Sequence, residues 1–319
     1  MRPAFSVVFL TTLCGAGQGL LIALFGIEWL MRLHPEWSAS LHVPQPFYVF
    51  GAGLALTLGV LGLVASVFHL GHPERAWRAI AMWRTSWLSR ECLALPVFLA
   101  TTFLYGVAHW MNAPWSLAVG GLAALASISL FVCTAMIYAC LRFLQEWATP
   151  LTLANFVLLG CASGFTMATA CAAWFAPVIV PVLGLVASLL TVAGCVSRVA
   201  TLARNERLHP RSTLQTATGI QASKVRQISR GFTASAFNLR EFFHGQSDAV
   251  MRRVKWGFIA GVFVVPLALL VVVLQGLQPL SATLLIAACV VQYAGLVAER
   301  WFFFAQARHP QNLYYQRAA

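Results

Sequence analysis

The sequence predicts an all-α membrane protein whose helices cross the bilayer several times. Of its 319 residues, 60% are hydrophobic and only 9% are charged, against about 25% in soluble domains. A chain with so few charges cannot cover a water-exposed surface, and its mean hydropathy of +0.77 is far from that of a disordered chain. Its apolar runs are long and unbroken, which argues against the alternating strands of a β-barrel.

Eight segments are long and apolar enough to cross the bilayer as helices, which takes about 20 residues each. The first of them is too long for the apolar run of a signal peptide, so we expect it to stay as a span. The eight segments are Phe5–Gly26, Phe47–Leu70, Cys92–Trp110, Trp115–Leu141, Leu151–Trp174, Pro177–Val199, Trp256–Leu274 and Leu280–Phe304.

The distribution of charge predicts the orientation of these spans. Eight spans put both termini on one side, and 20 of the 21 Lys and Arg residues fall on that side, with only Arg32 opposite. Since cytoplasmic loops are enriched in Lys and Arg, we expect both termini in the cytoplasm. The net charge of +12 is therefore a topology signal rather than a sign of nucleic-acid binding. Its surplus suits membrane lipid headgroups or an acidic protein partner.

The chain is predicted to be one integral-membrane domain over residues 1–319. Its external connections are short, whereas residues 200–255 form a long cytoplasmic loop between the sixth and seventh spans. Long loops often carry function, so we expect this loop to dock on a partner. The alternative is a mobile, lipid-facing loop.

The eight cysteines and the histidines give no sign of a bound metal. No two cysteines form a C-x-x-C pair, and most lie inside apolar segments, where Cys is usually a small buried hydrophobe. A b-type haem needs facing axial ligands, but His69 and His109 fall at opposite membrane faces. Pairing of His109 with His34 or His42 would be unusual. We therefore expect no haem, iron–sulfur cluster or zinc in this chain.

Ionisable groups inside spans are costly and therefore mark function. The span interiors hold Gln18, Asn155 and Gln292 but no mid-depth Asp, Glu, Lys or Arg. This composition weighs against a proton pump or an ion-coupled transporter. Glu28 and Glu36 fall in the first external loop, where we expect them to be solvated.

The richest set of polar residues follows the second span. His69 lies at its cytoplasmic end, Gly71 and Pro73 stop the helix, and Glu91 opens the third span, where the helix dipole favours a carboxylate. A histidine and a carboxylate at the membrane surface can hydrogen-bond a quinone carbonyl and move its protons. Arg300 lies at the same depth and either snorkels to the surface or reaches into this site. The alternative is a helix-capping turn with interfacial anchors.

These residues also carry a family resemblance. The run His69-Leu70-Gly71-x-Pro73-x-Arg75-Ala76, followed by Ser86-x-Leu88-Ser89-x-Glu91, resembles the membrane-anchor subunits of dimethyl sulfoxide reductases. The resemblance implies an anchor without haem that exchanges electrons with a membrane quinone, either ubiquinone or menaquinone. Molybdopterin and iron–sulfur clusters would then lie on two partners, a molybdopterin catalytic subunit and a ferredoxin-like iron–sulfur subunit.

The resemblance also implies roles for single residues. His69 would contact the quinone, and Glu91 would shape its site or a proton path, while Arg75 and Ser89 match the motif. Gly71 and Arg300 complete the predicted quinone-binding set. The sequence departs from the family pattern at His72 and Arg90. It also has Leu296 where an acidic residue is expected one turn before Arg300.

The predicted orientation selects a branch of the family. A relay on the cytoplasmic side resembles the quinone-linked sulfite dehydrogenases, as does the loop with Gln215-Thr216-Ala217, Gly231-Phe232-Thr233 and Phe237–Phe242. The predicted function is thus a quinone-binding anchor in the bacterial inner membrane. It would pass electrons from cytoplasmic sulfite oxidation to the quinone pool and hold no catalytic metal of its own. The alternatives are the anchor of a dimethyl sulfoxide or polysulfide reductase fed by quinol, and a haem-free transporter.

Overall fold

The computed structural model describes residues 1–209, 212–222, 224–225, 228, 244–276, 281–310 and 312, with only the backbone for 38–40. Within these residues the chain is helical and has no β-strand. Eight helical segments are long and apolar enough to cross a membrane, which confirms that prediction. They are α1 (Phe5–Leu33), α3 (Gln45–Val67), α4 (Trp87–Trp110), α5 (Ser116–Ala139), α6 (Pro150–Phe175), α7 (Val180–Glu206), the continuous run α10 (Asp248–Ile259), η3 (Ala260–Val264) and α11 (Val265–Leu274), and α12 (Ser281–Gln306).

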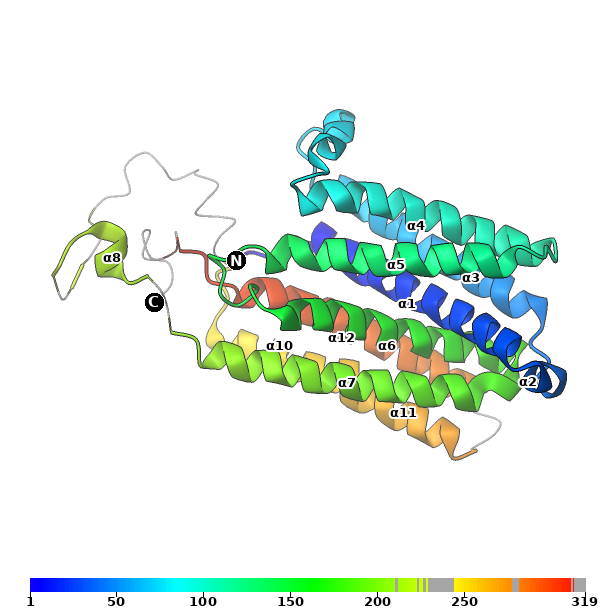
Figure 1. The fold of residues 1–319 in the computed structure, drawn as a ribbon. Helices are drawn as coiled ribbons and strands as arrows, with labels where there is room; N and C mark the ends of the chain where they lie inside the picture. Colours follow the sequence, from blue (N-terminus) through cyan, green and yellow to red (C-terminus); the bar gives the residue numbers. More distant parts are fainter. Residues whose placement is uncertain are drawn as a thin grey trace.

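Short elements join the long helices. The described ones are α2 (Pro35–Ser40), the 3₁₀ segments η1 (Pro73–Met82) and η2 (Pro177–Ile179), and α8 (Leu214–Thr218). Figure 1 shows η1 turned away from the bundle. Since α1 starts at the same end as η1 and finishes next to α2, we call the two ends of the bundle the η1 end and the α2 end.

Several predicted boundaries differ from the structure. Helix α4 begins at Trp87 rather than Cys92, so Glu91 lies in its second turn and does not open it. Helix α1 continues to Leu33, seven residues beyond the predicted end at Gly26, and it therefore includes Glu28. The predicted loop 200–255 is shorter, because α7 runs on to Glu206 and α10 begins at Asp248. The loop segment from Gly231 to Phe242, which carried part of the resemblance, lies outside the described residues.

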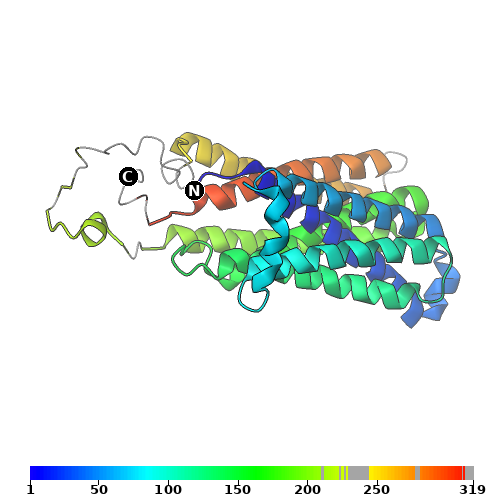
Figure 2. The same ribbon diagram turned by 90° about the horizontal axis from the view of Figure 1, so that it is seen from above.

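Helices α1 and α6 form the centre of the bundle. Helix α1 runs obliquely through it (Figures 1 and 2) and packs against α3, α5, α6 and α12. Glycines let the two backbones approach, with Gly15 and Gly19 on α1 facing Gly160 and Gly164 on α6. This pattern of small residues four apart is typical of close helix packing in membranes.

Replacing Gly164 by Ala is expected to destabilise the bundle by about 1–3 kcal/mol, because overpacking forces the backbone apart. A Cβ atom at Gly164 would overlap the backbone of Gly19 and Leu20 on α1. Thermal unfolding of the detergent-solubilised protein measures the effect. Gly53→Ala is the matched control, since a Cβ atom there meets nothing within 4 Å. Equal stability of the two variants would contradict close packing at this crossing.

The start of α1 and the end of α12 lie together at the η1 end. Val8 packs in one apolar cluster with Trp147, Phe303, Phe304 and Ala307. The even number of spans thus brings both ends of the bundle's chain to one face, as predicted. That this face is cytoplasmic remains a prediction.

The three predicted mid-span amides bridge helices. Gln18 donates from Nε2 to the Ser127 carbonyl oxygen at 2.9 Å, and Asn155 donates from Nδ2 to Thr201 Oγ1 at 2.8 Å. Gln292 on α12 reaches the Val262 carbonyl oxygen inside the π-helical turn η3 at 3.3 Å. Such hydrogen bonds hold membrane helices together, so these amides have a structural role.

Candidate functional site

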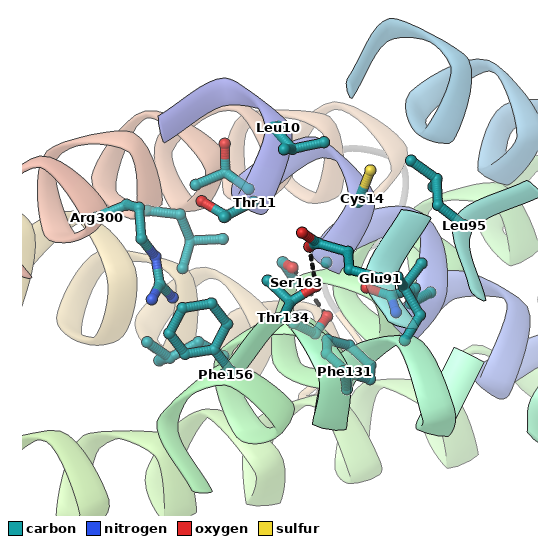
Figure 3. A pocket seen from close by; sticks show the side chains of 17 residues that line it. Leu10, Thr11, Cys14, Glu91, Leu95, Phe131, Thr134, Phe156, Ser163 and Arg300 are labelled. Atoms are coloured by element: carbon teal, nitrogen blue, oxygen red, sulfur yellow. Dashed lines mark hydrogen bonds between the residues drawn. The ribbon is translucent and has the colours of Figure 1, made fainter. Parts of the chain in front are cut away.

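A small polar cavity lies inside the bundle near the η1 end (Figure 3). Its volume of about 20 Å³ leaves room for water, since one water needs about 10–15 Å³ on this measure. An aromatic ring does not fit. Five helices line the cavity, with Leu10, Thr11, Thr12, Cys14, Gly15 and Gln18 from α1, Glu91 and Leu95 from α4, Leu130, Phe131 and Thr134 from α5, Phe156, Leu159, Gly160 and Ser163 from α6, and Leu296 and Arg300 from α12.

Glu91 is held at one wall of this cavity. Helix α4 begins after Ser86, whose side-chain oxygen accepts a hydrogen bond from the backbone N–H of Ser89 and caps the helix. Ser89 is buried, and Glu91 follows it by two residues and faces α5. There Thr134 Oγ1 donates to Glu91 Oε1 at 2.5 Å. The carboxylate therefore has one fixed hydrogen bond and a second oxygen beside a space with room for water.

Arg300 enters the cavity from the opposite wall (Figure 3). Its guanidinium carbon lies 3.7 Å from the centre of the Phe156 ring, a cation–π contact. Only 4% of Arg300 is exposed, so the expectation that it snorkels to the surface is wrong. Instead it lines the same cavity as Glu91, in agreement with the other expectation. Its Nε has no hydrogen-bond partner among the described residues.

A buried ion pair lies behind Arg300. Arg198 Nε on α7 is 2.7 Å from Glu299 Oε1 on α12, and each side chain is only 1% exposed. Arg300 Nη2 lies 3.6 Å from the other oxygen of Glu299. The charge distribution places Arg198 among the Lys and Arg residues of the cytoplasmic side, but its side chain lies inside the bundle. The family pattern predicts an acidic residue one turn before Arg300, at Leu296, whereas the buried carboxylate of this helix belongs to Glu299.

The other predicted site residues lie outside the cavity. His69, Gly71 and Arg75 are exposed at the η1 end, where the chain leaves α3 and enters η1. The backbone N–H of His69 donates to the Ser66 carbonyl oxygen. Partial burial lowers the pKa of His69 from its ordinary value, so the imidazole is neutral at pH 7. The structure thus brings Glu91 and Arg300 to one cavity and leaves His69 with Gly71 and Arg75 at the surface.

An apolar groove lies between α1 and α3, and its lining ends at Phe68, the residue before His69. Its volume is about 400 Å³, within the usual range for small-molecule sites of about 300–1,000 Å³. Phe68 forms one edge and is 81% exposed. The remaining lining residues are Ser6, Phe9, Leu13, Leu61, Val64 and Ala65. The groove depends on the spacing of two helices, so the sequence held no signal for it.

A second polar cluster lies at the α2 end. Glu28 on α1 is only 5% exposed, so the expectation that it is solvated is wrong. Ser116 Oγ donates to Glu28 Oε1 at 2.6 Å, and His109 Nε2 lies 3.2 Å from Glu28 Oε2. The His109 ring stacks on Tyr48 at 4.3 Å and meets the edge of Tyr105 at 4.6 Å. A carboxylate and an imidazole are thus shielded together at the far end of the bundle.

Comparison with known proteins places this eight-helix bundle in a family. Residues 1–315 match the model of the DMSO reductase anchor subunit family (DmsC), and the chain belongs to this family. It is therefore a membrane-anchor subunit, which works with catalytic partner subunits in an oxidoreductase. The chain is 49% identical to the sulfite dehydrogenase C-subunit of Allochromatium vinosum over 336 aligned residues that cover all of both chains. Both the family and the branch predicted from the sequence are confirmed.

Proposed function

We propose that the chain anchors a sulfite-oxidising complex in the bacterial inner membrane and binds the quinone that takes up its electrons. The likeness to a sulfite dehydrogenase subunit over the full length supports the substrate of the complex. The excess of Lys and Arg at the η1 end supports a cytoplasmic location for that end and for both termini. The iron–sulfur and molybdopterin partners would then dock on this end.

The apolar groove between α1 and α3 is the observation that carries the quinone proposal. It has the volume and the apolar lining that a quinone ring needs. The interior cavity has room for water alone. A quinone in the groove would lie beside His69 and within the membrane's surface layer, next to the end where the partners dock. A bound quinone takes up two electrons and two protons.

In this proposal some residues of the chain bind the quinone and others supply its protons. The groove side chains exclude water, and the neutral imidazole of His69 donates a hydrogen bond to a quinone oxygen. Glu91 would accept and pass on protons beside the small cavity, with Thr134 fixing the orientation of its carboxylate. Arg300 sets the electrostatic potential of that cavity from the opposite wall. Gly71 and Arg75 shape the turn above the groove.

Filling the groove tests where the quinone binds. Ala65→Trp is expected to raise the KM for quinone about tenfold, because losing about 1.4 kcal/mol of contact gives that factor. Sulfite oxidation with a soluble dye should be unchanged, since the dye takes electrons from the partner subunits. The measurement is steady-state kinetics of the purified complex with both acceptors.

Ala100→Trp is the matched control. Ala100 is an exposed small residue on α4 and does not line the groove. A KM for quinone that is the same in both variants would show that the quinone binds elsewhere. A complex without sulfite-dependent activity toward either acceptor would contradict the proposed substrate.

A further inference from the structure

A row of polar side chains runs along the inner faces of three helices. On α4 it consists of Glu91, Thr102, Tyr105 and His109, which are spaced so that they lie on one face of the helix. On α5 the polar residues are Ser116, Ser127 and Thr134, and on α1 they are Gln18 and Glu28. We call this row the polar seam.

Contacts between the helices place these residues at matching depths. Glu91 meets Thr134 at the η1 end, and Glu28 meets His109 and Ser116 at the α2 end. Since a helix rises about 1.5 Å per residue, Glu91 and His109 are about 27 Å apart along α4. This distance is close to the hydrocarbon thickness of about 30 Å. The seam therefore connects the two membrane faces.

The spacing within the seam suits short chains of water. At the same rise per residue, neighbouring polar residues of the seam lie about 5–10 Å apart along the bundle axis. From the η1 end, their order is Glu91, then Ser127 and Gln18 at one depth, then Thr102, Tyr105 and His109. About one to three waters span each step, because hydrogen-bonded oxygens lie about 2.8 Å apart. The cavity beside Glu91 already holds room for water at one end of the seam.

Thr102 gives an independent sign of a missing partner. It is completely buried, and its hydroxyl has no hydrogen-bond partner among the described residues. The neighbouring Thr101 satisfies its own hydroxyl by donating to the Val97 carbonyl oxygen of its helix. Buried hydroxyls are normally hydrogen-bonded, so the Thr102 hydroxyl is free to bind a water that enters the seam.

We propose that the polar seam conducts protons between the Glu28–His109 pair at the α2 end and Glu91 at the η1 end. The inference rests on the proposed quinone site. Each quinone that gains two electrons there also gains two protons, which the seam takes from the compartment at the α2 end. The protons released when water converts sulfite to sulfate appear on the partner side, so the two sets of protons belong to different compartments.

The test uses the complex in sealed vesicles with a pH-sensitive dye inside and a clamped membrane potential. Sulfite added outside drives only complexes whose partner subunits face outward, and the inside of the vesicle then borders the α2 end. The wild type is expected to make the inside more alkaline as quinone is reduced. Thr102→Val should lower the rate of internal proton uptake about tenfold, as expected when a barrier rises by about 1.4 kcal/mol.

Four further variants test folding and charge. Thr101→Val makes the same isosteric change one residue away and should behave as the wild type. Thr102→Ser restores the hydroxyl and should recover proton uptake. Glu28→Gln should reduce it, whereas Glu36→Gln should not, because Glu36 is an exposed carboxylate outside the seam at the same end.

The outcomes separate this inference from the proposed function. Two results would overturn the seam as a proton path and leave the quinone site intact. One is quinone reduction at the full rate with no internal pH change, and the other is equal proton uptake in Thr102→Val and Thr101→Val. A complex that oxidises sulfite with the soluble dye but reduces no quinone overturns both.

Discussion

Replacing His69 by Ala is expected to lower quinone reduction at least about 100-fold, the usual contribution of a positioned proton-transfer group. Sulfite oxidation with a soluble dye should remain at the wild-type rate, because that reaction ends on the partner subunits. Kinetics of the purified complex with each acceptor measure the two activities. In the proposed site His69 hydrogen-bonds the quinone oxygen, the atom that takes up a proton, and it follows Phe68 at the edge of the groove.

The pH dependence should follow the protonation of His69. Burial lowers the pKa of His69, so the neutral form prevails at and above the ordinary value near 6.5. Below that range the imidazole gains a proton and a charge that its surroundings disfavour. Quinone affinity is therefore expected to be constant at neutral and alkaline pH and to change only as the pH falls through the lowered pKa. This acid limb should be absent from the Ala variant.

His72→Ala is the control for the change at His69. His72 is exposed at the same turn, and its Nδ1 lies 3.0 Å from Glu74 rather than beside the groove. Its replacement should leave both activities unchanged. If His69→Ala lost quinone and dye activity equally, His69 would serve assembly of the complex instead of quinone binding.

The sequence predicted the spans because hydropathy is a local property. Each of the eight helices carries its own apolar run, so no knowledge of neighbours was needed. The same rule fails at Glu28, because it predicts that the first span ends at Gly26, before this charge. The helix continues through it because Ser116 and His109, which lie more than 80 residues away in the chain, satisfy the carboxylate.

The same distinction between local signals and long-range contacts applies to the candidate site. The motif around His69 and Glu91 pointed to the η1 end because its residues are close together in the sequence. The apolar groove and the pairing of Arg198 with Glu299 depend on how α1 meets α3 and how α7 meets α12. Such contacts carry no local signal. When a charge lies near a predicted span end, an opposite charge at equal depth in another span therefore indicates a buried ion pair.

Replacing Glu299 by Gln is expected to destabilise the protein by about 3–5 kcal/mol, the usual effect of removing one partner of a buried ion pair. Two guanidinium groups, those of Arg198 and Arg300, lie within 4 Å of this carboxylate, and all three side chains are almost inaccessible. Loss of the negative charge leaves two positive charges facing each other in an apolar interior. Thermal unfolding of the complex in detergent should show a large fall in Tm.

An exposed ion pair between the end of α7 and α10 provides the control. Lys255 Nζ lies 2.5 Å from Glu206 Oε1, but 63% of the Glu206 side chain is exposed. Glu206→Gln should change stability by less than about 1 kcal/mol, because water screens surface pairs. A similar effect of Glu299→Gln would mean that water or a partner reaches the buried carboxylate.

A double variant separates the charge pair from simple packing. Changing Arg198 and Glu299 together to Met removes both charges and keeps the side chains long and apolar. Stability is then expected to recover by several kcal/mol over the single Glu299 variant, since a buried pair stabilises little more than apolar residues of similar volume. Recovery would show that the large effect of the single change comes from an isolated charge. No recovery would mean that the carboxylate is needed for Arg300, which would tie the stability of this end of α12 to the cavity that also holds Glu91.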